Sequence, residues 1–187
     1  MKFREQHRLL FVCKGEFKMA NKIKMRVRKD NKGICKCCGG TNKNTLDLFD
    51  LCLGDELKTI HGKCIDLSQD SYKLKPNEFI LGSTLERVNV PYDLMGRVEG
   101  KSSIARLGVT IHITAGFIDA GFNGNVTLEI YNCSDKEFEL YHGMNICQIV
   151  FETLSSRVDR PYGCKELNSH YQNSEGTVLS KYEGLNG

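Results

Sequence analysis

The sequence predicts an all-β fold over residues 78–153, either a closed barrel or a jelly roll. Apolar and polar residues alternate there in short runs, which is the period of a β-strand. Glycine, proline and aspartate separate the runs, as they do in the turns of antiparallel sheets. No amphipathic helix of ordinary length occurs in this part of the sequence.

The expected elements follow one another with short connections. Residues 104–107 can form one helical turn, which Gly108 ends in the left-handed conformation. The loop 116–124 is rich in glycine and holds Asp119 and Phe122. The expected strands are 78–84, 87–90, 97–99, 109–114, 126–131, 137–140 and 146–151.

Glu129 is the most informative residue of this segment. It lies in the middle of a strand between apolar neighbours, where glutamate is unusual and burial favours the protonated form. A carboxyl group in that situation can both take and give a proton near neutral pH. The alternative is that its face of the strand points to water. Ser102, Arg106 and Asp119 lie on other turns and strands of the same segment, and a compact barrel is expected to bring all four together.

The turn GKSS at residues 100–103 has the composition of an anion site. Within four residues it offers backbone N–H groups, the hydroxyls of Ser102 and Ser103, and the cation of Lys101. These groups suit phosphate oxygens.

Cysteines dominate the region before residue 68. Nine cysteines in a chain without a signal peptide favour a metal over disulfides. A CxxC knuckle and a later HxxC pair, joined by a hairpin with strands at 46–51 and 57–60, indicate a structural zinc site. The expected Zn²⁺ ligands are Cys35, Cys38, His61 and Cys64. Cys52 is the alternative to His61, and ordinary reduced cysteines are the alternative to any metal.

The zinc is expected to be architectural. Zinc-dependent deaminases of bases and nucleosides pair an H-x-E or C-x-E element with a later P-C-x-x-C. No histidine here is followed by x-Glu, and no proline precedes Cys35.

Charge is unevenly distributed along the chain. The net charge is +3, but residues 1–34 hold eleven Lys/Arg against three Asp/Glu. We interpret this segment as a solvated basic arm that contains a strand at 23–27. Contact with nucleic acid is the alternative, which the lack of interleaved aromatic residues disfavours. No apolar run is long enough for a signal peptide or a membrane span, so we expect a cytoplasmic protein without membrane contact.

The chain is therefore expected to divide into four parts: the basic arm at 1–34, a zinc-knuckle module at 35–67, the β-barrel at 68–154 and a C-terminal lid or tail at 155–187.

Several long motifs can be compared with known families. They are FILGSTLERV, PYDLMGRVEGKSSIARLG, HITAGFIDAGFNGNVTLEIYN and GMNICQIVFE, all within residues 79–152, and the tail RPYGCKELNSHYQNSEGTVLS. The segment resembles the dCTP deaminases of the trimeric dUTPase superfamily, and the tail is similar to the lid of that family. The resemblance implies a dUTPase-like distorted barrel or jelly roll and a homotrimer with sites between subunits. This family usually opens with helices and a DLRLG-like strand, whose place the zinc-binding module takes here.

The resemblance also implies the chemistry, which is conversion of dCTP to dUTP and ammonia. Glu129 would shuttle protons while water attacks C4 of the base, and Ser102 and Arg106 would hold and polarise the water and the leaving group. Residues 112–115 would read the base edge with backbone groups. Asp119 would accept the 3′-OH of the deoxyribose.

Arg97 and the turn 101–103 would bind the triphosphate, with Mg²⁺ bridging the phosphates and a lid at 162–172 closing on them. The substrate-binding residues implied by the resemblance are Lys101, Ser103, His112, Ile113, Thr114, Ala115, Asp119, Phe122, Gln148, Tyr162, Lys165, Tyr171 and Gln172.

The sequence also departs from the family pattern. Lys101 stands where the family often has arginine, His170 replaces the usual lid lysine, and Ser174 replaces a lid glutamine. The sequence TAGFIDAGF resembles that of family members that also hydrolyse the dUTP product to dUMP and pyrophosphate. One alternative is a dUTP diphosphatase without deamination, which has no need of Glu129. The other is a non-catalytic regulator that binds nucleotides or nucleic acid. Inhibition by dTTP, known in relatives, stays open.

Overall fold

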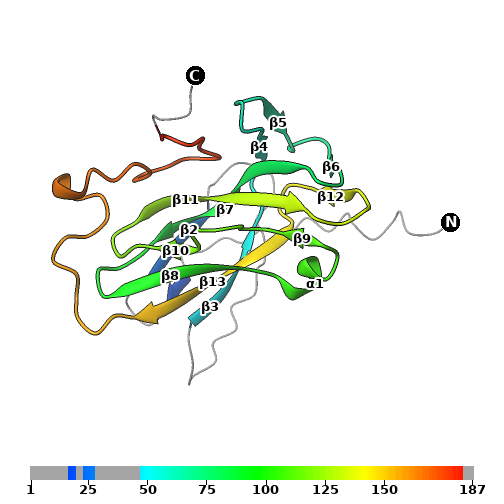
Figure 1. Cartoon of the computed structure of the whole chain (residues 1–187). Helices are drawn as coiled ribbons and strands as arrows, with labels where there is room; N and C mark the ends of the chain where they lie inside the picture. Colours follow the sequence, from blue (N-terminus) through cyan, green and yellow to red (C-terminus); the bar gives the residue numbers. More distant parts are fainter. Residues whose placement is uncertain (1–16, 20–22, 28–46, 183–187) are drawn as a thin grey trace.

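The structure, a computed structural model, describes residues 17–19, 23–27 and 47–182 (Figure 1). Its main body is two antiparallel sheets packed face to face. The larger, seven-stranded sheet runs in the order β1 (Phe17–Met19), β2 (Ile23–Val27), β7 (Phe79–Asn89), β11 (Asn123–Asn132) and β9 (Val109–Thr110), with β4 (Glu56–Lys58) beside β7 and β5 (Cys64–Asp66) beside β4.

The second sheet has four strands, in the order β10 (Phe117–Ile118), β8 (Leu94–Gly100), β13 (Asn145–Thr153) and β3 (Asp47–Cys52). A two-stranded sheet pairs β6 (Tyr72–Leu74) with β12 (Phe138–Leu140). Helical structure among the described residues is limited to α1 (Ser102–Ala105) and the 3₁₀ turn η1 (Lys165–Leu167). The predicted all-β class is therefore confirmed.

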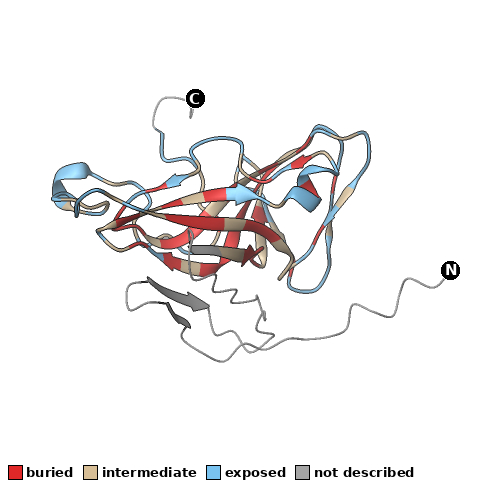
Figure 2. Ribbon diagram, turned by 90° about the horizontal axis from the view of Figure 1, so that it is seen from below, coloured by how far each residue is buried: buried red, intermediate tan, exposed pale blue. Residues whose placement is uncertain are grey.

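The core lies between the two main sheets, where the buried residues concentrate (Figure 2). On β11, Leu128 and Ile130 are fully buried and belong to this core, whereas Thr127 and Glu129 are only half-buried. A strand places successive side chains on opposite faces. Glu129 therefore lies on the face of β11 that points away from the core.

Most predicted strands are present, with changes in extent. The strands expected at 78–84 and 87–90 are the single strand β7, eleven residues long. The strand expected at 109–114 ends at Thr110, and the chain then leaves the sheet as a loop. The strand expected at 23–27 is confirmed as β2, and it pairs with β7.

The hairpin predicted between 46–51 and 57–60 is wrong. β3 pairs with β13 in the four-stranded sheet, whereas β4 pairs with β5 and β7 in the larger one. The chain crosses from one sheet to the other at Gly54, whose N–H donates to Ser83 O at 2.8 Å. A Cβ atom there would lie 3.0 Å from Ser83 Oγ, so glycine permits the close approach. Residues 47–58 are thus strands of the barrel, not of a separate module.

The predicted zinc ligands fall only partly within the described residues. Cys35 and Cys38 lie outside them, and His61 and Cys64 are exposed around the turn between β4 and β5. Cys52, the alternative ligand, is fully buried in the core and does not fit with two exposed partners. Over the described ranges, no group of three or more His, Cys, Asp or Glu is arranged to hold a metal. The zinc site with Cys35, Cys38, His61 and Cys64 stays a prediction.

None of the helices within residues 17–19, 23–27 and 47–182 has the length and apolarity that crossing a membrane requires.

Candidate functional site

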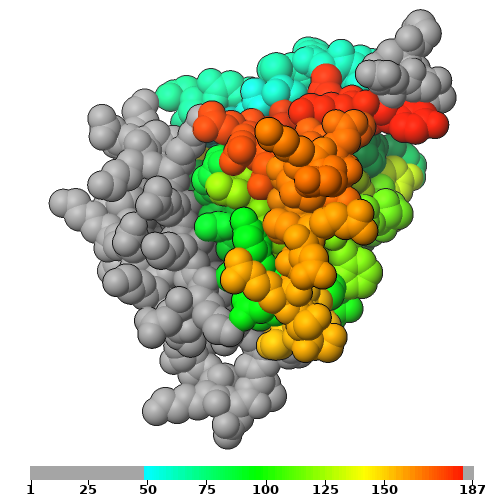
Figure 3. Space-filling model, turned by 90° about the vertical axis from the view of Figure 1, so that its left-hand side faces the viewer, coloured from blue at the N-terminus to red at the C-terminus, as the bar shows by residue number. Residues whose placement is uncertain are grey.

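A cavity of about 1060 Å³ lies beside the outer face of β7 and β11. The C-terminal segment 161–180 lies across these strands and forms its other wall (Figure 3). The loop 112–119 closes one side. Predicted site residues that line this cavity are His112, Ile113, Thr114, Ala115, Asp119, Phe122, Glu129, Tyr162 and Tyr171.

Glu129 is on the cavity wall, opposite Leu81 of β7. Its Oε2 accepts a hydrogen bond from the backbone N–H of Thr114 at 3.3 Å. The residue is half-buried, and its hydrogen bond to Thr114 lies at the surface of the cavity.

The pairing of β11 with β7 is irregular just before Glu129. The pairing of β11 with β7 shifts between Asn125 and Thr127. The buried Asn125 side chain stabilises the shift, because its Nδ2 donates to the carbonyls of Thr84 at 2.9 Å and Glu86 at 3.1 Å. Asn125 was not predicted as a site residue, and alternation alone carries no signal for a bulge.

The loop after β9 brings backbone groups to the carboxylate. Ala115 has φ of 57°, in the left-handed region, and Gly116 O accepts from Val98 N at 2.8 Å. A non-glycine residue in this conformation is sustained only by its surroundings. The turn presents the N–H of Thr114 toward Glu129.

The opposite end of the cavity is partly aromatic. The rings of Phe122 and Tyr162 lie 5.8 Å apart between centroids, and Asp119 lines the same end. Burial is the main cause that raises the pKa of Tyr162, and the charge of Asp119 acts in the same direction. The Tyr162 hydroxyl accepts from Tyr171 N at 3.0 Å.

Two predicted lid residues do not line the cavity. Lys165 is exposed on η1. Gln172 has its amide engaged with backbone groups: Oε1 accepts from Asn123 N at 2.9 Å, and Nε2 donates to Gly121 O at 2.9 Å. Gln172 therefore fixes the tail to the barrel in this structure, and its amide is not directed into the cavity.

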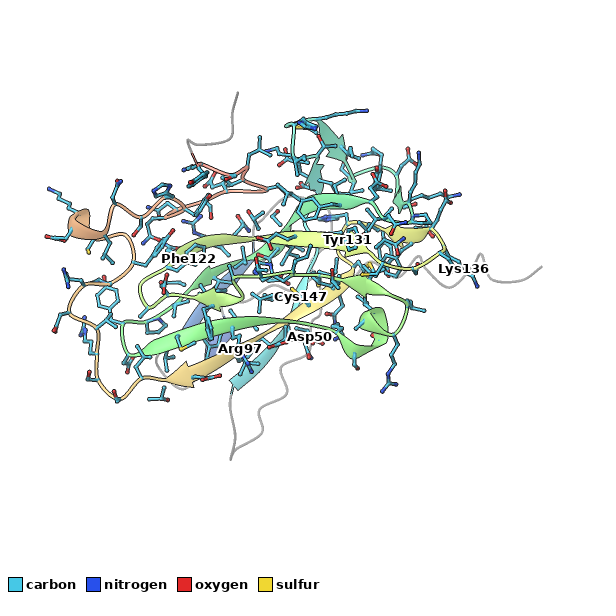
Figure 4. The ribbon with its side chains drawn as sticks, viewed as in Figure 1. Asp50, Arg97, Phe122, Tyr131, Lys136 and Cys147 are labelled. Carbon is cyan, nitrogen blue, oxygen red and sulfur yellow. The ribbon has the colours of Figure 1, made fainter. Side chains whose placement is uncertain are left out.

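The predicted residues of the GKSS turn also lie apart from the cavity. Ser102, Ser103 and Arg106 are exposed on and after α1. Gln148 lies on the face of the four-stranded sheet that points away from the core, next to Lys101, which bonds Asp50 at 2.8 Å. Figure 4 shows Asp50 and Arg97 at this sheet, whereas Tyr131 lies on β11 and Phe122 just before its start. Within one chain Ser102 and Arg106 do not meet Glu129, because they are exposed on and after α1 and do not line the cavity.

The sequence contained a signal for Asp50 that the zinc interpretation obscured. Residues 50–54 read DLCLG and run through the end of β3 to the corner at Gly54. This matches the DLRLG-like strand expected of the family, with Cys52 in the place of the arginine. The strand is thus present, and the opening of the barrel is less atypical than expected.

Comparisons with known proteins agree with this geometry. A family model described as dCTP deaminase-like matches residues 36–154. A "dCTP deaminase, dUMP-forming" of Methanosphaera stadtmanae is 49% identical over 108 residues, which are 58% of this chain and 55% of that protein. One of Halobacterium salinarum is 50% identical over 115 residues, 62% and 58% of the two chains. The chain thus spans less than two thirds of the length of these curated relatives.

Solved structures show the same fold at low sequence identity. The 2′-deoxycytidine 5′-triphosphate deaminase of Agrobacterium tumefaciens has a TM-score of 0.51 at 20% identity, over 63% of this chain and 43% of that one. The dUTPase of EIAV has a TM-score of 0.50 at 19% identity, over 75% and 96%. A mutant dUTPase of phage phi11 of S. aureus, described with a structural Mg(II) ion, has 0.51 at 17%, over 78% and 99%. The predicted dUTPase-like fold is confirmed.

Proposed function

Because the chain belongs to the dCTP deaminase-like family, we propose that it deaminates dCTP to dUTP and ammonia. The observation that carries the proposal is Glu129, a half-buried carboxylate on the wall of a nucleotide-sized cavity and bonded by the Thr114 N–H at 3.3 Å. A carboxylate held beside a bound base can act as general base and general acid in turn.

Water supplies the oxygen in the proposed reaction. Glu129 takes one proton from the water as it attacks C4 of cytosine and passes it to N3. It then takes the second proton from the resulting 4-hydroxyl and passes it to the amino group. The C4–N bond breaks and ammonia leaves, so dCTP and water become dUTP and ammonia. Backbone groups of residues 112–115 read the base, and Asp119 accepts the sugar 3′-OH beside Phe122.

The catalytic set is completed by a neighbouring copy in this proposal. Ser102 and Arg106 do not line the cavity of their own chain, and an exposed apolar rim surrounds its mouth. Ile113 is 49% exposed there and Phe117 67%. Apolar side chains gathered at one place favour burial by a partner. A homotrimer would bring the Ser102–Arg106 turn of one copy to the Glu129 of another.

The phosphates would lie beside the GKSS turn, at residues 100–103, which the neighbouring copy contributes to this shared site. Lys101, Ser103 and Gln148 offer the donors, and Mg²⁺ would arrive with the nucleotide, bound by its phosphate oxygens. The tail residues Tyr162 and Tyr171 would cover the sugar end. Lys165, exposed on η1, would reach the phosphates only if the tail shifts.

A second step to dUMP and pyrophosphate is the natural extension, because the curated relatives are named dUMP-forming. The alternative, diphosphatase activity without deamination, would leave Glu129 without a role on the cavity wall.

The test is incubation of the full chain with dCTP, dUTP, dTTP or CTP and Mg²⁺, resolving ammonia, dUTP, dUMP and pyrophosphate. Ammonia from dCTP but not from CTP is expected. Pyrophosphate from dUTP with no ammonia from dCTP would favour the diphosphatase instead, and binding without any product would favour a regulatory protein.

A further inference from the structure

The outer face of the four-stranded sheet carries a carboxylate to which the proposed reaction gives no role. Asp50, on β3, lies directly opposite Gln148 on β13. The Asp50 side chain is 19% exposed and that of Lys101 is 22% exposed. Both charged groups are therefore largely removed from water.

Three donors converge on this carboxylate. Lys101 Nζ and Gln148 Nε2 each donate to Asp50 Oδ1 at 2.8 Å, and Asn145 Nδ2 donates to Oδ2 at 2.9 Å. Burial acts to raise the pKa of Asp50, but the three hydrogen bonds and the charge of Lys101 outweigh burial and lower the pKa below its usual value. Asp50 is therefore an anion at neutral pH.

Lys101 and Gln148 are also two of the groups that would bind the phosphates. A phosphate oxygen that approaches them meets donors already directed at an anion, and meets the like charge of Asp50 itself. Charge-assisted hydrogen bonds of this kind are stronger than neutral ones. Moving them from the Asp50 carboxylate to a phosphate therefore changes the affinity for phosphate.

We propose that Asp50 is an internal counter-anion of the polyphosphate subsite, which holds Lys101 and Gln148 in place and competes with the phosphates for them. The inference rests on the proposed function, which assigns these two residues to phosphate. Asp50 keeps the affinity for polyphosphate low, and low affinity favours release of a dUTP or pyrophosphate product.

The variant Asp50→Asn tests this inference in the full chain. It removes the negative charge but keeps an oxygen that accepts from Lys101 or Gln148. Calorimetry with inorganic tripolyphosphate should give a dissociation constant about fivefold lower than for the wild type, the effect of a partly exposed ion pair. The matched control Asp70→Asn, which removes one charge from an exposed loop between β5 and β6, should leave the dissociation constant unchanged.

A double-mutant cycle identifies the partner. In a Lys101→Gln background, Asp50→Asn should no longer tighten tripolyphosphate binding. A gain that persists in that background, or binding in Asp50→Asn no tighter than in Asp70→Asn, overturns the inference. If Asp50→Asn does not fold, Asp50→Ser retains a hydroxyl acceptor and carries the same expectation.

The probe separates this inference from the proposed function, because tripolyphosphate has no base. Tighter binding in Asp50→Asn with no ammonia from dCTP keeps the inference and removes the deamination. Deamination of dCTP with unchanged tripolyphosphate binding in Asp50→Asn keeps the proposed function and removes the inference about Asp50. A chain that binds no tripolyphosphate, as wild type or variant, overturns the inference.

Discussion

The cavity beside Glu129 and the polar face beside Asp50 belong to different sheets of one barrel and are built in different ways. The cavity is complete within the chain: β11 supplies its floor, the loop 112–119 one side and the tail 161–180 its roof. Its polar lining combines side chains, such as Glu129 and Asp119, with backbone groups held by turns, such as the Thr114 N–H. The polar face consists of side chains that satisfy one another, as Lys101 and Gln148 do with Asp50.

If the proposed function holds, this difference separates recognition of the base from binding of the phosphates. Backbone groups fixed by turns can read a base edge with little rearrangement. Side chains that are paired with a neighbouring anion must exchange partners before they bind phosphate. Ser102 and Arg106 are exposed beside the paired cluster, and in the proposed homotrimer a second copy brings them to the cavity.

The largest expected effect is that of Glu129→Gln. The amide cannot transfer protons, so ammonia release from dCTP should fall by about 10³-fold, within the range of general acid–base catalysis. The dissociation constant for dCTP should change by less than about threefold. The control Glu137→Gln alters an exposed glutamate on the turn before β12 and should leave the rate unchanged. Deamination at the wild-type rate by Glu129→Gln would show that Glu129 does not transfer the protons.

Mixing inactive variants tests whether Glu129 of one copy and Arg106 of another form one shared site. Arg106→Ala and Glu129→Gln should each be inactive alone. Unfolded and refolded together in equal amounts, they should regain about one quarter of the wild-type activity, because about one site in four then takes both intact residues from different copies. Activity is measured as ammonia release. No recovery in a mixture shown by mass to contain mixed oligomers would contradict a shared site.

The stability of the barrel should depend on Glu86, which joins the two sheets. Its Oε2 accepts from Cys52 N at 2.9 Å, and it is 4% exposed. Burial raises the pKa of Glu86 from 4.5 to about 7. The native state thus binds this proton more tightly than the unfolded state does. The contribution of protonated Glu86 to the free energy of unfolding is fully present below pH 4.5 and is lost as the pH rises through 7.

Between pH 5 and 8 the expected loss is about 2–3 kcal/mol in the free energy of unfolding. Glu86→Gln keeps the acceptor for Cys52 N and should flatten this part of the profile, measured by urea unfolding at several pH values. Glu137→Gln should keep the wild-type slope. An identical slope in wild type and Glu86→Gln would show that Glu86 does not titrate in this range.

The smallest expected effect is that of Gln172→Ala at the root of the tail. Loss of the bonds to Asn123 N and Gly121 O should cost about 1–2 kcal/mol in the stability of the docked tail. The measurement is the rate of proteolysis within residues 161–180, which should rise. Tyr182→Ala, beyond the docked region, is the control. An unchanged rate would mean that Gln172 does not fix the tail.

Much of the fold was predictable because strand alternation is local. The spacing of Leu128 and Ile130 predicts a buried face of β11, and they are buried. Alternation does not name a strand's partner, which is why 46–51 was paired with 57–60 instead of with β13. Apolar and polar residues also alternate over 111–114, which predicts a longer strand. These residues instead form a loop, which bonds such as that from Val98 N to Gly116 O hold in place.

The candidate site was predictable as a set of residues but not as an arrangement. Glu129 was identified because a glutamate among apolar strand residues is locally improbable. Three features depend on contacts between residues far apart in the chain. The irregular pairing at Asn125 involves Glu86, 39 positions away, the amide of Gln172 bonds Asn123, 49 away, and Asp50 pairs with Lys101, 51 away. Sequence spacing gives no measure of such contacts.

By itself, the sequence determined the strands, the family motifs and the candidate acid, because each follows from the period or identity of neighbouring residues. Only the tertiary structure decided which sheet each strand joined and which groups shared a surface. Those outcomes arise from the packing of two sheets against one core, where the position of every side chain depends on residues distant in the chain.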